Sequence, residues 1–267
     1  GPILQRVYER LPIEFVGLYL DPDGNLPNHG LDPMKAENRA ELERRVVAEG
    51  ADAGFAFDGD GDRFFAIDDR GHFVPGDFLT ALMAGYLIEA EPGATMIYDV
   101  RCSWAVRDVV EAAGGTALQE RVGHSFLKPR LLREAGVFAG ELSGHYYFRD
   151  FFGADSGLVP SLILMQMMSE RQQTMSQMLS PLESRYFLSG EINSQVADPL
   201  AKIEEIAARY GDGLTERVDG VSISFDDWHF NVRASNTEPL LRLNLEAMSR
   251  QRMEQQRDEV LAVIRMP

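Results

Sequence analysis

The chain has 267 residues, of which 45% are hydrophobic and 25% charged, and its formal net charge is −16. This length predicts about two domains with a sizeable core. So acidic a surface repels nucleic acid and anionic membrane, so we expect neither as a partner, and an anionic substrate would need local positive charge in its site. No apolar run reaches the ~18 residues of a membrane span. Cys102 is the only cysteine, which predicts a buried thiol and fits a reducing, cytoplasmic location.

The first seventy residues alternate between helical and extended patterns. We expect helices over 3–11 and 33–50 and strands over 14–20, 53–57 and 64–67. Asp32-Pro33 offers a cap and a first-turn proline for the second helix, and Gly50 offers its stop. Such alternation predicts an α/β layer with a largely parallel sheet. The pattern lacks a strand ahead of the first helix, so we expect this domain to be incomplete at its N-terminus.

The next segment, from about residue 71, repeats the α/β alternation. We expect helices over 78–90, 103–113, 126–135 and 157–179, and strands over 95–100, 116–122 and 137–139. Asp77 and Ser125 are the expected caps of the first and third of these helices. The methionines of the last helix are predicted to lie in the core rather than to form a cofactor site: Met165, Met167, Met168, Met175 and Met178. A linker is expected over 181–190.

After the expected linker, the sequence pattern changes to short strands flanked by two helices. We expect a helix over 199–210, strands over 213–218, 221–225, 228–232 and 240–245, and a final helix over 249–265. Asp219-Gly220 is a strong hairpin-turn signal. This order indicates a small α+β domain. The predicted fold is therefore two α/β domains, the first incomplete, followed by an α+β domain.

One short stretch concentrates carboxylates: Asp58-Gly59-Asp60-Gly61-Asp62-Arg63. Alternation along an extended backbone places the three aspartates on one side, and their oxygens suit Mg²⁺ or Ca²⁺. Arg63 adds a positive charge at the rim. A solvated acidic turn is the alternative. An EF-hand is excluded, because its sixth position needs Gly where Arg63 stands and its twelfth needs Glu where Asp69 stands.

A second loop, Gly140-Glu141-Leu142-Ser143-Gly144-His145, places a carboxylate, a hydroxyl and an imidazole on a glycine-framed turn. Such a set can hydrogen-bond the vicinal hydroxyls of a sugar. It is not a nucleophile elbow, because the positions flanking Leu142-Ser143-Gly144 are Glu141 and His145. By itself the loop is also compatible with a purely structural turn.

A third loop, Arg233-Ala234-Ser235-Asn236-Thr237-Glu238-Pro239, offers a guanidinium, two hydroxyls and an amide. That inventory suits a phosphate, although a polar hairpin would have the same composition. His124 lies in Gly123-His124-Ser125 at an expected helix N-terminus, a position that attracts anions. Arg101 ends an expected strand, and it is either a surface ion-pair partner or a cation of the site.

Taken together, the loops resemble those of the α-D-phosphohexomutase family, the phosphomannomutase/phosphoglucomutase enzymes. Further matches are Asp23-Gly24-Asn25, Pro27-Asn28-His29, Tyr98-Asp99-Val100-Arg101 and Gly123-His124-Ser125. All occur in the family's order over essentially the whole chain. The resemblance implies that residues 1–70, 71–185 and 186–267 are the second, third and fourth domains of a four-domain enzyme.

The resemblance also implies a reaction. A Mg²⁺-dependent enzyme would interconvert hexose 1-phosphate and hexose 6-phosphate, of mannose or glucose, through a phosphoserine and a hexose 1,6-bisphosphate that is also an activator. The partner would be a small phosphosugar, the location the cytoplasm, and a dimer is compatible with the likeness. Phosphoryl transfer needs mainly positioning and charge neutralisation, which these loops can supply.

Residue roles follow from the same likeness. Asp58, Asp60 and Asp62 would hold the metal, and Arg63 and His124 would be catalytic. The implied substrate-binding residues are Arg101, Glu141, Ser143, His145, Arg233, Ser235, Asn236 and Thr237. Among these, Glu141 and Ser143 would bind sugar hydroxyls, and the residues of the third loop would bind the phosphate that does not react.

Two departures from the family pattern limit these expectations. Arg101 stands where the family usually has Lys, and a guanidinium that stays charged fits binding better than proton transfer. The family's serine loop, of the Thr-Ala-Ser-His-Asn-Pro type, is absent from the sequence, so we expect the chain to be inactive alone. A module that binds metal and phosphosugar without turnover is therefore one alternative. The phosphoglucosamine branch is another, although Leu142 and Asn236 favour the mannose or glucose branch.

Overall fold

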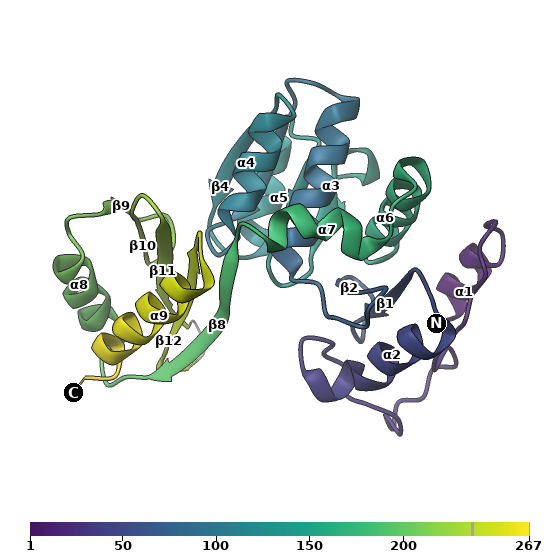
Figure 1. The fold of residues 1–267 in the computed structure, drawn as a ribbon, viewed down its shortest axis with the longest axis horizontal. Coiled ribbons are helices and arrows are strands. Elements are labelled where there is room, and N and C mark those ends of the chain that lie inside the picture. The colour runs from purple at the N-terminus through teal and green to yellow at the C-terminus, as the bar shows by residue number, and fades with distance from the viewer. Residues whose placement is uncertain (236–237, 267) are drawn as a thin grey trace.

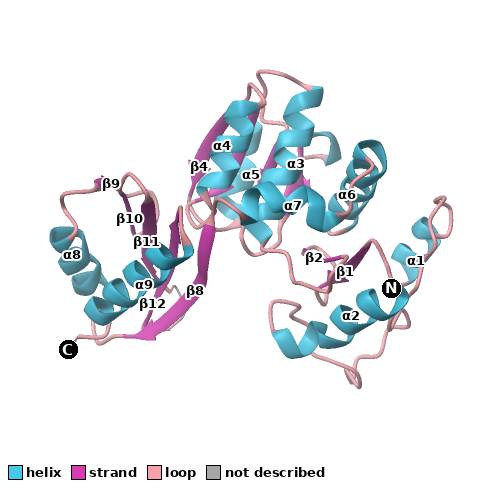
Figure 2. Ribbon diagram, in the orientation of Figure 1, coloured by secondary structure: helices cyan, strands magenta, loops and turns pink. Residues whose placement is uncertain are grey.

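The computed structural model of the protein describes residues 1–235 and 238–266. They form three consecutive units, and the central unit lies between the other two (Figure 1). Each unit combines helices with strands (Figure 2). The expected class, two mixed α/β units followed by an α+β unit, is confirmed. In the described part of the chain, no helix is both long enough and apolar enough to cross a membrane.

The amino-terminal unit contains one hairpin. Its elements are α1 (Pro2–Tyr8), α2 (Ala36–Glu49), β1 (Ala53–Phe57) and β2 (Phe64–Asp68). The strands pair antiparallel, with Phe57 opposite Phe64, so the acidic stretch is their connection and is held at both ends. The expected parallel arrangement is wrong for this pair, because so short a connection cannot make the crossover that parallel strands need.

The strand expected over 14–20 is also wrong, since this segment is irregular. An extended segment becomes a strand only where a neighbour takes its backbone hydrogen bonds. Among the described residues, β1 and β2 pair only with each other. Phe15 instead packs edge-on against Tyr8 of α1, with 5.2 Å between ring centroids.

The helix expected from Pro33 begins three residues later, at Ala36. Asp32 forms a turn of its own, in which its carboxylate accepts a hydrogen bond from the backbone N–H of Met34 at 3.0 Å. The stop at Gly50 is as expected, because this residue adopts the left-handed conformation with φ +64°, which glycine reaches without strain.

The central unit is a sheet between helices. Its elements are α3 (Gly76–Ala90), β3 (Thr95–Asp99), α4 (Trp104–Ala112), β4 (Thr116–Glu120), α5 (His124–Arg133), β5 (Phe138–Gly140), β6 (Tyr146–Phe148), a 3₁₀ turn (Arg149–Phe151), β7 (Ala154–Asp155), α6 (Leu158–Arg171) and α7 (Met175–Glu183). The strand order is β4-β3-β5-β6-β7. The first three strands are parallel, and the last two are added antiparallel.

The middle of strand β3, residues 96–98, is apolar without a break because the strand is covered on both faces. Met96 and Tyr98 join the core that α3 and α4 cover, whereas Ile97 faces the opposite core with Leu127 and Leu131 of α5. A strand covered on both faces reads as an unbroken hydrophobic run. Polar residues therefore gather just past the carboxyl ends of β3, β4 and β5, where parallel α/β sheets bind their ligands.

The long helix expected over 157–179 is divided into α6 and α7. Gln172 ends α6 in the left-handed conformation with φ +52°. Thr174 then starts α7 with a capping box, in which its hydroxyl and the Gln177 side chain satisfy each other's backbone N–H groups. Met167, Met175 and Met178 are buried, and Met168 packs against the same core, so the core role is confirmed for these four. Met165 is half-buried.

The linker expected over 181–190 is wrong. Helix α7 continues to Glu183 and the strand β8 begins at Phe187, so the connection is much shorter. In Figure 1, β8 runs from beside α7 into the carboxy-terminal unit. The second and third units are therefore joined by a strand rather than by a flexible tether.

The carboxy-terminal unit is an antiparallel sheet with two helices. Its elements are β8 (Phe187–Gln195), α8 (Pro199–Arg209), β9 (Leu214–Glu216), β10 (Val221–Ser224), β11 (Trp228–Ala234), β12 (Leu240–Ala247) and α9 (Arg250–Ile264). The strand order is β8-β12-β11-β10-β9. Strands β9 and β10 pair antiparallel on either side of Asp219-Gly220, as the turn signal predicts.

Alternation gives this sheet one apolar and one polar face. Phe230, Val232 and Leu243 pack against α8 and α9 in one core. Arg233 and Arg242 lie opposite each other in the β11–β12 register and so share the other face. That polar face carries the contacts with the central unit.

Trp104, at the start of α4, makes two of those contacts. Its backbone N–H donates to the Glu246 carboxylate at 3.2 Å, and its ring stacks on His229, with centroids 4.4 Å apart. The Asp219 carboxylate accepts the backbone N–H of Val122 at 3.2 Å. These contacts hold the carboxy-terminal sheet against the N-terminus of α4 and the loop after β4.

Asp77 makes stability depend on pH at this boundary. It lies inside the first turn of α3, not at the cap, which is Pro75. Its carboxylate accepts hydrogen bonds from the N–H groups of Phe78 and Ser103. Burial, and next the charge of Glu246, raise the pKa of Asp77 to about 7. Because the folded pKa exceeds the unfolded one, this contribution to stability is complete below about pH 4 and is lost as the pH rises through about 7.

We therefore expect Asp77→Asn to flatten the pH dependence of the unfolding free energy. Between about pH 5 and pH 8 the wild-type chain should lose about 3 kcal/mol more than the variant. Urea unfolding at each pH measures this difference, with the exposed Asp52→Asn as the matched control. Parallel curves for wild type and Asp77→Asn would contradict the assignment.

Candidate active site

The three aspartates of the metal loop, residues 58–63, converge as expected. Asp58, Asp60 and Asp62 each offer a carboxylate oxygen, and these atoms lie within 4.8 Å of one another. The β1–β2 hairpin imposes this convergence, because it fixes both ends of the loop. Three hard oxygen donors at that separation fit a divalent cation such as Mg²⁺, with water or phosphate oxygens completing the coordination.

The surroundings of the loop favour the charged form of Asp58 and disfavour that of Asp62. Burial tends to raise the pKa of Asp58, but hydrogen bonds from the backbone and guanidinium of Arg63 outweigh it and hold the pKa below its usual value. The Arg63 Nε to Asp58 Oδ2 distance is 2.6 Å. Burial raises the pKa of Asp62, against the opposing effect of His145, and the charges of Asp58 and Asp60 add to the rise. A bound cation would offset that crowding of negative charge.

The sugar loop, residues 140–145, connects β5 to β6 and places its three polar side chains in contact. The Ser143 hydroxyl lies 3.3 Å from Glu141 Oε2 and 3.1 Å from His145 Nδ1. Tyr147 donates its hydroxyl to Glu141 Oε1 at 2.5 Å. Burial and the Glu141 charge raise the pKa of Tyr147, so its hydroxyl remains a donor. The arrangement leaves a carboxylate, a hydroxyl and an imidazole side by side.

The metal and sugar loops are joined although they come from different units. His145 Nε2 lies 3.5 Å from Asp62 Oδ1, and Arg63 and His145 form a backbone bridge. The N–H of Phe64 donates to the carbonyl of Gly144 at 2.9 Å. Gly144 has φ +89°, and a Cβ there would meet the Phe65 ring at 2.8 Å, so only glycine fits this close approach.

Arg101 is almost fully buried, with 6% of its side chain exposed. Its guanidinium donates to both oxygens of Asp99, at 2.9 and 2.8 Å. Arg101 outweighs burial and holds the pKa of Asp99 low, and Asp99 also accepts the N–H of Leu142 at 2.9 Å. Arg101 Nη2 lies 3.7 Å from Glu141 Oε2. Arg101 is therefore a buried ion-pair partner beside the loop 140–145 and not a surface one.

The phosphate loop, residues 233–239, begins with Arg233 at the end of β11, on the polar face of the carboxy-terminal sheet. Arg233 has 7% of its side chain exposed. Ser235 Oγ accepts from Arg242 Nη2 at 3.3 Å. Asn236 and Thr237 lie outside the described residues.

His124 stands apart from the other candidates. It is the exposed first residue of α5, with Gly123 as the N-cap. Ser125, the expected cap, lies inside the helix. Within the described chain, no hydrogen bond or ion pair connects the His124 side chain to the loops above.

The structure also adds residues that the sequence did not single out. Asp155 can share a metal-sized cluster with Asp62 and His145, and it pairs with Lys128 at 2.8 Å. Glu191 contacts Arg233, Arg242 and Arg101. The sequence gives no signal for these, because neither Asp155 nor Glu191 lies in one of the three loops.

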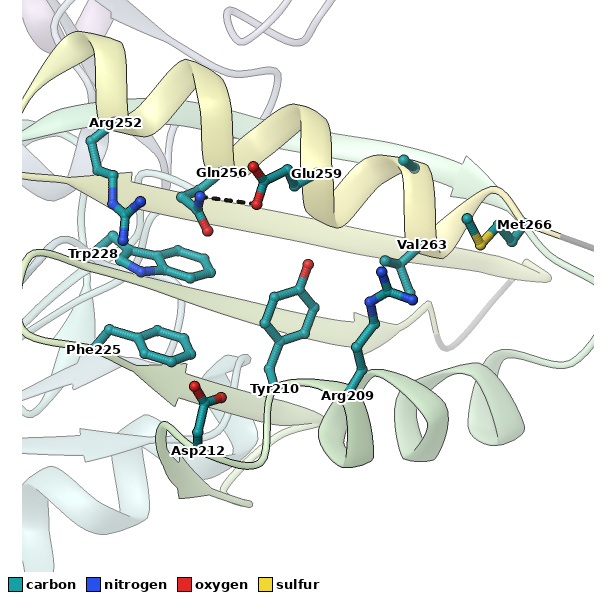
Figure 3. A pocket seen from close by; sticks show the side chains of 11 residues that line it. Arg209, Tyr210, Asp212, Phe225, Trp228, Arg252, Gln256, Glu259, Val263 and Met266 are labelled. Carbon is teal, nitrogen blue, oxygen red and sulfur yellow. Dashed lines mark hydrogen bonds between the residues drawn. The ribbon is translucent and has the colours of Figure 1, made fainter.

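A pocket of about 560 Å³ lies elsewhere, on the apolar side of the carboxy-terminal sheet. Figure 3 shows Arg252 beside the Trp228 ring, with Tyr210 below α9. Trp228 and Arg233 lie on opposite faces of β11 by strand alternation. This pocket is therefore separate from the loops that carry the candidate chemistry.

Comparison with known proteins agrees with this geometry. Models of the phosphoglucomutase/phosphomannomutase family match three parts of the chain: alpha/beta/alpha domain II over residues 1–71, alpha/beta/alpha domain III over 75–186 and the C-terminal domain over 191–263. The domain II match starts at residue 1. All three matches follow the order of the units.

Curated relatives include the phosphomannomutase of Salmonella typhimurium, 40% identical over 254 residues, which cover 92% of this chain and 56% of that protein. The Escherichia coli K12 phosphomannomutase is 39% identical, with the same coverage. The chain thus spans little more than half the length of these relatives.

Among solved structures, a phosphoglucomutase/phosphomannomutase family protein from Burkholderia thailandensis superposes with a TM-score of 0.89. It is 31% identical, and the match covers 99% of this chain and 57% of that one. The loops, the fold and these relatives lead to one conclusion: the chain belongs to the α-D-phosphohexomutase family of phosphoglucomutases and phosphomannomutases.

Proposed function

We propose that the metal loop, the sugar loop and the phosphate loop are the binding parts of a phosphohexomutase. This enzyme would interconvert the 1- and 6-phosphates of mannose or glucose. Residues 1–70, 71–185 and 186–267 are then its second, third and fourth domains. The observation that carries the proposal is a continuous polar path across all three units. It runs through Asp62, His145, Ser143, Glu141, Arg101, Glu191 and Arg233, with steps of 3.1 to 3.7 Å.

Such a path suits a phosphosugar with charge at one end and hydroxyls in the middle. Glu141 and Ser143 can accept from and donate to ring hydroxyls, with His145 beside them. Arg233 and Ser235, with Asn236 and Thr237, bind the phosphate that does not react. By the family likeness, Arg101 and His124 would face the sugar, although no hydrogen bond or ion pair connects the His124 side chain to the other loops in the described chain.

The acidic end is where phosphoryl transfer takes place. Mg²⁺, held by Asp58, Asp60 and Asp62, would supply charge neutralisation for the transferred phosphoryl group. Arg63 would lie beside the phosphoserine that donates it, and its pairing with Asp58 at 2.6 Å orients the guanidinium. The product of the first transfer is a hexose 1,6-bisphosphate, which must then present its other phosphate to the same serine.

The phosphoserine is not part of the 267 residues, because no Thr-Ala-Ser-His-Asn-Pro type loop occurs in them. We therefore infer that this chain alone binds the phosphosugar without turnover. The full-length protein is proposed to be a cytoplasmic enzyme acting on a small phosphosugar, with a dimer as a compatible assembly.

The test is calorimetric titration of the 267-residue chain with glucose 1,6-bisphosphate in Mg²⁺, beside a mutase assay. We expect saturable binding and no turnover, because the binding loops are present and the nucleophile is absent. Robust turnover by this chain would contradict the missing-nucleophile argument, and absence of binding would contradict the assigned site.

The sugar is tested on the full-length protein with mannose 1-phosphate, glucose 1-phosphate and glucosamine 1-phosphate. We expect higher kcat/KM for the first two, since Leu142 and Asn236 are typical of that branch. A preference for glucosamine 1-phosphate would instead place the protein in the phosphoglucosamine branch.

A further inference from the structure

Glu191 occupies a particular place in the fold. It lies on β8, the strand that leads from the central unit into the carboxy-terminal sheet (Figure 1). The register places it opposite Asn244 of β12, two residues from Arg242. Alternation therefore places Glu191 and Arg242 on the same polar face.

One carboxylate there contacts three guanidinium groups. Glu191 Oε1 lies 3.1 Å from Arg242 Nη1, and Oε2 lies 3.1 Å from Arg233 Nη2. Oε2 is also 3.7 Å from Nη1 of Arg101. Arg101 belongs to the central unit and the other two arginines to the carboxy-terminal unit, so Glu191 bridges the boundary between them.

The charges explain why such a bridge is needed. Burial lowers the pKa of Arg233, the charges of Arg101 and Arg242 lower it further, and Glu191 opposes them. Arg101 has Asp99 as a second partner. Within the described residues, Glu191 is the one carboxylate that pairs with Arg233 or Arg242. Without it, two arginines that face each other in register would repel each other and Arg101.

Arg233 and Arg242 can still bind an anion after these ion pairs are made. The Nε atoms of Arg233 and Arg242 are buried and have no hydrogen-bond partner among the described residues. Buried donors of this kind are normally satisfied. Asp99 already pairs with Arg101, so Arg233 and Arg242 share the single carboxylate of Glu191 and keep one excess positive charge for a phosphate.

We propose that Glu191 is a positioning residue of the phosphate-binding site. It holds the guanidinium groups of Arg233 and Arg242 beside Arg101, so that one preassembled anion site is shared by the central and carboxy-terminal units. Glu191 acts through these arginines and does not itself contact the phosphosugar. This assignment rests on the proposed function, because Glu191 would position the arginines of the phosphate site proposed there.

The test compares variants of the 267-residue chain by titration with glucose 1,6-bisphosphate in Mg²⁺. Glu191→Gln keeps the size of the side chain but removes its charge, and we expect the Kd to rise at least about tenfold. Glu191→Asp keeps the charge with a shorter reach and should recover most of that loss. Glu216→Gln, an exposed change in the same unit, should leave the Kd unchanged.

Two further readouts separate positioning from general stability. Mg²⁺ affinity at the acidic loop should be the same in all variants, because that loop lies in another unit. In the full-length mutase, Glu191→Gln should raise KM more than it lowers kcat, because the non-reacting phosphate is bound throughout.

An unchanged or lower Kd in Glu191→Gln would overturn the proposal while leaving the proposed function intact. If Glu191→Gln does not fold, Glu191→Asp decides: a Kd raised about threefold supports positioning, and an unchanged Kd overturns it. No binding by the wild-type chain would overturn the proposed function and this assignment with it.

Discussion

Asp60→Ala is expected to lower the Mg²⁺ affinity of the metal loop at least about a hundredfold, because it removes one of three anionic ligands from a divalent cation. Asp60 is the cleanest of the three positions to change. It is exposed, whereas Asp58 also holds Arg63 and Asp62 also faces His145. Loss of affinity in Asp60→Ala therefore reports on the metal and not on the fold.

The measurement is calorimetric titration of Mg²⁺ into wild type, Asp60→Ala and the exposed control Asp52→Ala. Wild-type binding should itself be weak, since three aspartates leave coordination positions that a phosphoserine would fill. In the full-length enzyme, we expect Asp60→Ala to lower kcat by roughly two orders of magnitude. Equal Mg²⁺ affinity in wild type and Asp60→Ala would exclude this loop as the metal site.

Arg233→Lys is expected to weaken binding of glucose 1,6-bisphosphate roughly thirtyfold, about 2 kcal/mol. Lysine keeps the charge, so Glu191 is not left unpaired in a site where Arg233 is only 7% exposed. It loses the planar fork that can grip a phosphate and a carboxylate together. In full-length protein, KM for the hexose phosphate should rise by a similar factor.

The matched control is Arg217→Lys, an exposed arginine of the same unit that pairs with Glu204 at 2.7 Å. It should leave both the Kd and the thermal midpoint unchanged. An Arg233→Lys variant that binds the bisphosphate as tightly as wild type would show that the phosphate lies elsewhere.

Errors in predicting the fold arose where a partner or a local cap decided the outcome. The segment 14–20 has the composition of a strand, yet no described strand lies beside it to take its hydrogen bonds. The segment 157–179 is rich in methionine and leucine and favours one long helix. The capping box of Thr174 and the left-handed Gln172 nevertheless divide it, because satisfying free backbone groups there outweighs continuation of the pattern.

Most candidate site residues were identifiable from the sequence, since their chemistry is concentrated in three short loops. Asp58, Asp60 and Asp62 lie within five consecutive residues, and the hairpin that holds them is itself a local structure. Glu141, Ser143 and His145 are close for the same reason. Composition and spacing within a loop are local properties, and a linear sequence displays them directly.

The relations among the loops were decided only by the tertiary structure. Arg101 has the same sequence context whether it is a surface ion-pair partner or a buried cation, and only its contacts with Asp99 and Glu191 distinguish the two. The register of β8 and β12 brings Glu191 beside Arg242, which lies about fifty residues away in sequence. By itself the sequence determined which chemical groups are present and that they sit on loops. The tertiary structure decided which groups form ion pairs, because pairing across strands and units depends on distances that sequence spacing does not encode.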